Sequence, residues 1–319
     1  MSQPPYHLSP NKAVDRLLFV DVIRRFGRDT DLAEYTYYSM GGPYLEDFRL
    51  MYEFFPDMKM VSIERDTEVF KRQNFHLPCG HVTLLHTDLK TFINTYNQGD
   101  AKSIFWLDNT GLEYSHFDEF MTALQKLSAG SVIKLTLDAS FRKFMTVPPD
   151  ESRKRFAEFC RKFEVVMPAG VRTPPTTAKE SASLLQTMVR TASERALPGT
   201  MPLMFQPLSS FYYKDTALML TVTGVLLSRK DSDATVQLFS GWQFANVDWR
   251  EPRLIDLPTL TTKERLHLQC HLPCAHDGGR VLREVLGYQT GENAAQTERQ
   301  LSQYAEYHRY SPYFVRSVP

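Results

Sequence analysis

The sequence predicts an α/β protein with a mostly parallel β-sheet, helices on both faces, an antiparallel edge hairpin and a helical C-terminal extension. Three observations lead to this prediction. Short apolar runs alternate with amphipathic stretches in the first half of the chain, polar or glycine residues close each run, and the pattern changes after residue 140. This alternation is typical of βαβ units with right-handed crossovers, so the fold class is Rossmann-like. The predicted strands are 35–40, 58–63, 82–86, 103–107 and 131–137.

Helical segments fill the intervals between these runs. A broad apolar face predicts a helix over residues 12–27. Pro43 fits the first turn of the helix after the first strand, because its missing N–H costs nothing there. Ser115 and Asp118 have the spacing of a cap for a later helix. The remaining helices of this half are expected at 66–75, 89–97 and 115–127.

The second half combines helices with a hairpin. Residues 210–227 form two apolar runs joined at Lys214 and Asp215, which would add an antiparallel edge to the sheet. Residues 234–244 predict one more strand. Two further helices are expected at 151–163 and 178–195, and polar helices follow toward the C-terminus.

These elements suggest four segments along the chain. We expect no independent core within residues 140–319. The segments are an N-terminal helical segment (1–30), a Rossmann-like core (31–145), helices and a hairpin that complete the sheet (146–230), and a C-terminal extension (231–319).

Composition narrows the classes of function. The chain has 37 basic and 37 acidic residues, which removes a broad electrostatic attraction to nucleic acid. A local nucleic-acid contact by the basic stretch 142–162, with its interleaved phenylalanines, stays open beside the alternative of a packed helix with charges outward. No apolar run is long enough for a membrane span, the N-terminus lacks a secretory pattern, and four cysteines do not make a disulfide scaffold. We expect a cytoplasmic location.

Residues with chemical potential follow four of the predicted strands. Ligands of an open parallel sheet bind outside the carboxyl ends of its strands. Glycines allow close backbone approach, a carboxylate after the second strand can accept ribose hydroxyls, and one after the third can hold an adenine amino group. The residues are Gly41 and Gly42, Glu64, Asp88, and Asp108 with Asn109. They predict a nucleotide site in the segment 31–145.

The order of these features resembles the class I S-adenosylmethionine-dependent methyltransferase superfamily over about residues 32–140. The segments that carry the resemblance are Tyr38–Gly42, Ser62–Asp66, Thr87–Asp88 and Leu107–Gly111. The segments 63–66 and 108–111 are also distantly similar to the bacterial three-Cys-motif partner proteins. The first loop reads Ser-Met-Gly-Gly-Pro-Tyr over residues 39–44, so it lacks the acidic residue and the full glycine pattern usual in that superfamily.

The resemblance implies S-adenosylmethionine as cofactor, with its methyl group near Asn109, Tyr114 and Tyr44. Asp108 or Asn109 would orient the acceptor, and catalysis would rest on positioning because the sulfonium is already a good methyl donor. Glu64 would bind the ribose, Asp88 the adenine, and Gly41 and Gly42 the rest of the cofactor beside Asp108. The altered first loop motivates an alternative: a catalytically silent partner or effector subunit of a bacterial defence or toxin system, which would assemble with a partner protein or a second copy.

Each of these residues also has an ordinary structural interpretation. Gly41 and Gly42 can be a simple turn, and Asp108 with Asn109 can fold back on their own backbone. Glu64, Asp66 and Asp88 can cap the helices that follow them.

A separate Cys/His group lies near the C-terminus. Cys270, Cys274 and His276 have metal-ligand side chains at spacings that match the usual zinc motifs poorly, so we expect no metal.

Overall fold

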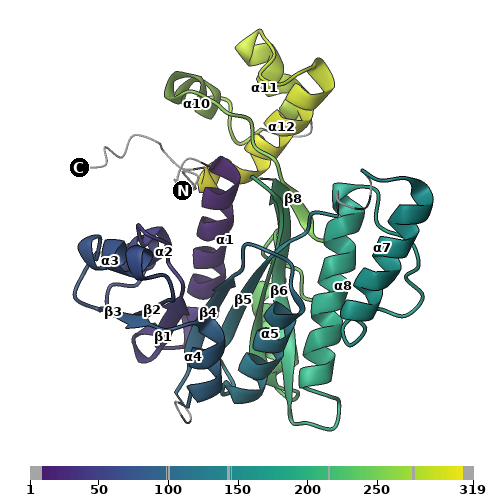
Figure 1. Ribbon diagram of the computed structural model, residues 1–319. Coiled ribbons are helices and arrows are strands. Elements are labelled where there is room, and N and C mark those ends of the chain that lie inside the picture. Colours follow the sequence, from purple (N-terminus) through teal and green to yellow (C-terminus); the bar gives the residue numbers. More distant parts are fainter. Residues whose placement is uncertain are drawn as a thin grey trace. The chain divides into compact units, whose positions relative to one another are not determined.

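The computed structural model describes residues 9–97, 99, 101–141, 144, 146–214, 216–274 and 277–311. Within these residues an eight-stranded sheet has the order β3-β2-β1-β4-β5-β7-β6-β8. Figure 1 shows this sheet with helices packed around it. The strands are β1 (Thr36–Ser39), β2 (Lys59–Glu64), β3 (Val82–His86), β4 (Ser103–Asp108), β5 (Val132–Asp138), β6 (Leu203–Lys214), β7 (Leu218–Ser228) and β8 (Arg253–Ile255).

The five predicted strands of the first half are confirmed as one parallel set. β1 pairs in parallel with β2 and with β4, so Tyr38 lies opposite both Val61 and Phe105. β2 continues to β3 and β4 to β5, again in parallel. The connections therefore run outward in opposite directions from β1 and β4, and this switch point is where open α/β sheets bind ligands.

The predicted edge hairpin is also confirmed, with longer strands than expected. β7 pairs antiparallel with β5, and β6 lies beside β7. Gly224 permits this packing, because a Cβ there would lie 2.3 Å from the Phe205 ring and 2.7 Å from the Gln206 carbonyl oxygen.

The helices agree with most of the predicted segments, and three details differ. The described helices are α1 (Pro10–Phe26), α2 (Glu46–Phe54), α3 (Thr67–Phe75), α4 (Leu89–Thr95), α5 (Tyr114–Lys126), α7 (Pro149–Lys162), α8 (Ala178–Ala196), α9 (Ser232–Phe239), α10 (Thr262–Gln269), α11 (Gly278–Leu286) and α12 (Ala294–Tyr307), with 3₁₀ turns at Gly27–Asp29, Leu32–Glu34 and His308–Tyr310.

Two corrections concern helix starts. Pro43 is not in the first turn of α2, because the chain makes a turn through Leu45, at φ 52°, before the helix begins. Ser115 and Asp118 do not cap α5. That helix is capped by a box formed between Glu113 and His116, so it begins one residue earlier than expected.

The third correction concerns residues 234–244, which do not form a strand. They begin in α9, whose buried Thr235 and Phe239 are four residues apart, the spacing of one helical face. Trp242 and Phe244 follow and pack together with ring centroids 5.7 Å apart. Their aromatic content resembles that of a strand, but the rings fill a core beyond the end of a helix.

Alternate side chains of β1 face opposite layers. Tyr37 packs against Phe48 of α2, with centroids 5.2 Å apart, whereas Tyr38 packs against Phe92 of α4 at 5.4 Å. Successive strand residues point to opposite faces, so α2 and α4 cover different sides of β1. On the α4 side, α4 contacts α5 and α5 contacts α8 (Figure 1).

The basic stretch after β5 forms a packed helix, α7, from Pro149 to Lys162. Phe156 and Phe159 of α7 are buried, and the centroid of Phe156 lies 5.5 Å from that of Phe144. Arg153 and Arg161 on the same helix are exposed. This arrangement agrees with the alternative of charges outward and aromatic rings inward, while Arg142 and Lys143 lie outside the described residues.

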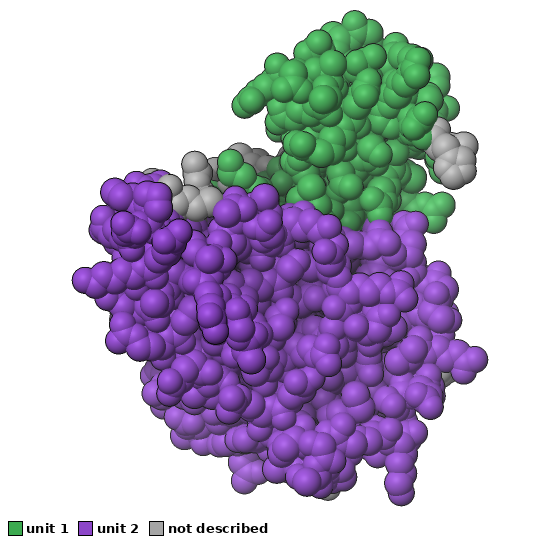
Figure 2. Space-filling model, turned by 90° about the vertical axis from the view of Figure 1, so that its right-hand side faces the viewer, with its two compact units in different colours: residues 1–19, 213–216, 254–319 green, residues 20–212, 217–253 purple. Residues whose placement is uncertain are grey.

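The chain divides into two compact units, coloured separately in Figure 2. Residues 20–212 and 217–253 form the unit with the parallel strands, and residues 1–19, 213–216 and 254–319 form the other. Residues 140–253 thus lie almost entirely with the first half, while 254–319 cluster with the N-terminus. The predicted boundaries at 30, 145 and 230 stay predictions. No described helix is long and apolar enough to cross a membrane.

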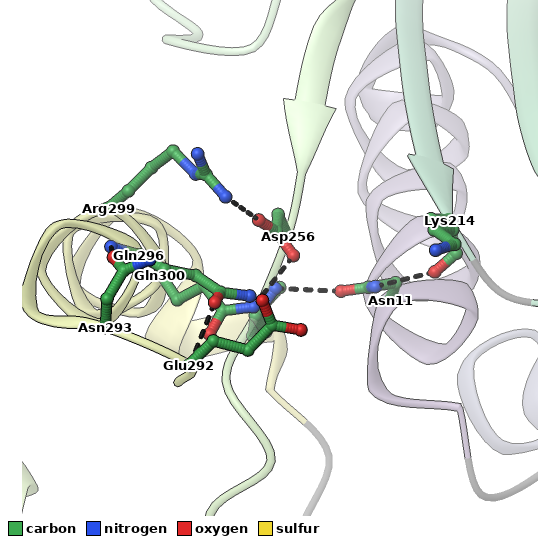
Figure 3. Close-up of polar contacts among 9 residues, drawn as sticks. Asn11, Lys214, Asp256, Glu292, Asn293, Gln296, Arg299 and Gln300 are labelled. Carbon is green, nitrogen blue, oxygen red and sulfur yellow. Dashed lines mark hydrogen bonds and ion pairs between the residues drawn. The ribbon is translucent and has the colours of Figure 1, made fainter. Parts of the chain in front are cut away.

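Asn11 joins three segments of the smaller unit (Figure 3). Its side-chain nitrogen donates to the Lys214 carbonyl at 3.0 Å, and its oxygen accepts from the Leu257 N–H at 2.9 Å. Nearby, Asp256 accepts hydrogen bonds from Arg299 and Gln300 of α12. A single buried amide therefore connects the start of α1, the end of β6 and the segment after β8.

We expect Asn11→Ala to lower the free energy of unfolding by about 2–4 kcal/mol, because it leaves two backbone groups without a partner in the protein. Denaturant unfolding monitored by circular dichroism measures this. Asn293→Ala is the control: Asn293 is an exposed cap of α12, and its loss costs about 1 kcal/mol. Equal losses for the two variants would contradict the bridging role of Asn11.

Candidate functional site

The turn after β1 contains two glycines with different roles. Gly41 and Gly42 both adopt positive φ, at 68° and 57°. A Cβ at Gly41 would lie 2.6 Å from Leu45 and 2.7 Å from Phe48, so this glycine is required by packing. A Cβ at Gly42 would meet nothing within 4 Å. The simple-turn interpretation therefore explains Gly41, whereas the backbone at Gly42 leaves room for a ligand to approach.

Gln73 of α3 holds this turn in place. Its buried side-chain nitrogen donates to the carbonyl oxygens of Met40 at 2.8 Å and Gly42 at 2.9 Å. Ser62 of β2 donates to the Gln73 side-chain oxygen at 3.0 Å. Gln73 was not predicted from the sequence. Its signal is a polar residue three positions after Phe70 on the inner face of a predicted helix.

Tyr44 leans on α3. Arg72 lies 4.8 Å from the centre of its ring and donates to its hydroxyl at 2.6 Å, and the His76 ring is 5.2 Å away. The ring is partly exposed. The Tyr44 hydroxyl therefore accepts a hydrogen bond from α3. The expected position of Tyr44 near the transferred methyl group stays a prediction.

Glu64 ends β2 and does not cap the next helix. The cap of α3 is Asp66, whose Oδ1 accepts from the N–H groups of Glu68 and Val69, both at 2.9 Å. Glu64 accepts from the Asp66 N–H at 2.7 Å, and burial raises the pKa of this half-buried carboxyl. The capping interpretation is therefore correct for Asp66 and wrong for Glu64.

Asp88 is the cap of α4. Its two carboxylate oxygens accept from the N–H of Thr91 at 2.9 Å and from the Thr91 hydroxyl at 2.6 Å. These hydrogen bonds lower the pKa of Asp88, whose side chain is exposed. The capping interpretation is correct here, and a contact with adenine stays a prediction.

Asp108 and Asn109 leave β4 beside β5. The Asn109 N–H donates to the Thr136 carbonyl at 3.2 Å, which fixes the start of the loop. The Asn109 side chain is 7% exposed, and its Nδ2 has no hydrogen-bond partner among the described residues. An unpaired buried donor costs about 1–3 kcal/mol, so an acceptor from outside the described chain, a water or a ligand group, would stabilise this amide.

Tyr114 points toward α7. It is the first residue of α5, and its ring centroid lies 6.3 Å from that of Phe163. The turn before it is held by His116, whose Nδ1 accepts from the Glu113 N–H at 3.3 Å, while Glu113 also pairs with Lys162. Burial lowers the pKa of His116, so the ring is neutral at neutral pH. The catalytic role of Tyr114 stays a prediction.

A buried pair on the α2 side of β1 was not found from the sequence. The Tyr37 hydroxyl donates to Asp47 Oδ2 at 2.7 Å, and both side chains are buried. Burial raises the pKa of Tyr37 well above its usual value, and the carboxylates of Asp47 and Asp108 add to this rise. An acidic residue in the first turn of a helix is common, so the sequence contains no sign that Asp47 pairs with Tyr37.

The Cys/His group is only partly described. Cys270 and Cys274 are free thiols, and Gly278 packs so closely on Cys274 that a Cβ there would lie 2.7 Å from its sulfur. His276 lies outside the described residues. The expected absence of metal stays a prediction.

The structure therefore gathers Gly41, Gly42, Glu64, Asp108 and Asn109 at the carboxyl ends of β1, β2 and β4. These are adjacent strands, and Ser39 lies opposite Ser62 in their register. S-adenosylmethionine fits this group of residues. The open backbone at Gly42 can approach a ligand, Glu64 can accept ribose hydroxyls, and Asn109 has a donor to spare.

Comparison with known proteins gives a family. The family described as "Putative O-methyltransferase" matches residues 4–318, and no curated protein matched the sequence. One similar solved structure, "a putative O-methyltransferase from Klebsiella pneumoniae", is 14% identical, with a TM-score of 0.40 over 70% of this chain and 84% of that one. Another is the O-methyltransferase TomG from Streptomyces achromogenes in complex with S-adenosylmethionine. It is 11% identical, with a TM-score of 0.40 over 69% of this chain and 82% of that one.

The family match spans nearly the whole chain and confirms the predicted class I methyltransferase with S-adenosylmethionine as its cofactor. The chain belongs to this O-methyltransferase family.

Proposed function

We propose that the protein transfers the methyl group of S-adenosylmethionine to an oxygen of its acceptor at the carboxyl ends of β1, β2 and β4. The main support is the position of Glu64. It leaves the end of β2 half-buried, and the capping of α3 falls to Asp66 instead. A carboxylate placed there with no capping task is suited to the two hydroxyls of a ribose.

The other residues have complementary tasks in this proposal. The backbone at Gly41 and Gly42 would lie against the cofactor, and Asp88 would reach the adenine edge while it continues to cap α4. Asp108 would accept a hydrogen bond from the acceptor hydroxyl, and one of the two side-chain N–H groups of Asn109 would donate to the acceptor oxygen. The cofactor itself supplies a sulfonium-activated methyl group. What these side chains contribute is the alignment of the acceptor oxygen with that group.

The alternative, a silent partner or effector subunit of a bacterial defence or toxin system, stays a hypothesis. No described contact favours it, and Tyr44 lies against α3 in the structure. A calorimetric titration with S-adenosylmethionine, S-adenosylhomocysteine, NAD and ATP separates the two functions. Binding of the first two supports the methyltransferase, and binding of none would favour the alternative.

We expect Glu64→Ala to weaken binding of S-adenosylhomocysteine by about ten- to a thousandfold, because two charge-assisted hydrogen bonds are lost. Its thermal stability should change little, since Glu64 caps no helix. Asp66→Ala should do the reverse: about 1 kcal/mol less stability, with binding retained. Calorimetry and thermal melts on both variants measure this. If Glu64→Ala bound S-adenosylhomocysteine as tightly as the wild type, Glu64 would not be part of the binding site.

The pH dependence of binding gives a second test of Glu64. Burial raises its pKa, so its carboxylate is protonated at a higher pH than an ordinary glutamate. Because only the charged form accepts two strong hydrogen bonds, affinity should fall as the pH drops through that raised pKa. Glu64→Gln should bind weakly and without this dependence. A dependence that persists in Glu64→Gln would assign the titration to another group.

We expect His116 to make the fold less stable in mild acid. Burial lowers its folded pKa below the ordinary 6.5, so below 6.5 the unfolded chain takes up a proton that the folded one resists. The free energy of unfolding should therefore fall from pH 6.5 down to the lowered pKa and level off below it. Urea unfolding across this range measures the effect, and His116→Gln should show a smaller slope. Identical slopes would exclude His116 as the cause.

A further inference from the structure

Tyr37 and Asp47 lie on either side of the first loop, which lacks an acidic residue. Tyr37 and Ser39 are alternate residues of β1 and therefore share one face of the sheet. Ser39 is the last residue of the strand. Asp47, in the first turn of α2, accepts from the Tyr37 hydroxyl at 2.7 Å. A carboxylate of the following helix thus contacts β1 at a side chain two residues before the strand ends.

The surroundings of Asp47 favour a cation. Asp47 is 6% exposed, and its one side-chain hydrogen-bond partner among the described residues is a neutral hydroxyl. No lysine, arginine or histidine of the described chain forms an ion pair with it. Asp108, at the end of the neighbouring β4, is close enough to raise the pKa of the same tyrosine. A buried carboxylate is costly unless it is paired, so a positive group of a ligand would be strongly favoured there.

A second, independent observation comes from the loop after β4. The side-chain Nδ2 of Asn109 is buried and has no hydrogen-bond partner among the described residues. Asn109 follows Asp108 directly in the chain, and of its two N–H groups one can donate to the cofactor while the other donates to the methyl acceptor. A ligand group with both a positive charge and acceptor oxygens would satisfy Asp47 and Asn109 together. An α-amino acid, with its ammonium and carboxylate, is such a group.

We infer that Asp47, held by Tyr37, binds the ammonium group at the amino-acid end of S-adenosylmethionine, in place of an acidic residue at the end of β1. This inference rests on the proposed function. Asp47 is the binding residue and Tyr37 is a positioning residue that acts through it. Ser39 is small, which suits a position beneath the ligand.

The competing interpretation makes the pair a simple link between β1 and α2. In that case its loss lowers stability and affects every bound nucleoside to the same extent. The two interpretations therefore differ in one measurable quantity: the dependence of affinity on the amino-acid end of the ligand.

The experiment compares two ligands by calorimetry: S-adenosylhomocysteine, and 5′-methylthioadenosine, which has the same nucleoside thioether but no amino-acid end. Asp47→Asn keeps an oxygen that can accept from Tyr37 and removes the charge. We expect it to weaken S-adenosylhomocysteine by about ten- to a hundredfold, the range for one charge-assisted hydrogen bond, and 5′-methylthioadenosine by less than about twofold. Asp66→Asn, an exposed helix cap, is the matched control and should change neither affinity.

Tyr37→Phe is the second variant, and it keeps the carboxylate if Asp47→Asn fails to fold. It should reduce the preference for S-adenosylhomocysteine over 5′-methylthioadenosine by a smaller factor, since Asp47 is then less well oriented.

Equal losses for the two ligands, an unchanged preference in Asp47→Asn, or a wild type that binds both ligands equally would overturn the inference and leave the proposed function standing. A wild type that binds neither ligand would overturn both.

Discussion

The parallel pairing of β1 with β2 on one side and β4 on the other is the constraint on which the rest depends. It places the ends of three strands at one edge, so that Ser39 and Glu64 emerge on one face of neighbouring strands and Asp108 leaves the next strand along. The turn after β1 can then be short, and Gln73 fastens it through two carbonyl oxygens. No element of the site would keep its position without this register.

The strands of the first half were predictable because each is an apolar, β-rich run closed by polar or glycine residues, a local signal. The prediction of a strand at residues 234–244 was wrong. The aromatic rings of Phe239, Trp242 and Phe244 are as typical of a strand as of a core packed beyond the end of a helix. The prediction of the α5 cap was wrong for a related reason. Glu113 and His116 form a box whose second member is not the glutamate or glutamine that the usual pattern requires.

The site was predictable to the extent that its residues directly follow strands. Strand-end position suggested Glu64, Asp88 and Asp108, but it could not separate a ligand contact from a helix cap. The hydrogen bonds of Asp66 and Asp88 make that distinction. The hydrogen bonds of Asp47 and Gln73 depend on contacts between residues 10 and more than 30 positions apart. Such contacts exist only once α2 and α3 dock on the sheet, so periodicity alone gives no sign of them.

Moving the acidic group from β1 to α2 has a consequence for how binding and folding are linked. A carboxylate on the strand would be fixed by the sheet ladder, whereas Asp47 is fixed by the packing of α2, through Tyr37 and the contact of Phe48 with the same tyrosine. Burying this charge opposes the docking of α2, and a bound ammonium offsets the cost. The ligand and the helix therefore stabilise each other. The same docking closes Leu45 and Phe48 over Gly41, so occupancy of the site also favours the turn that forms its floor.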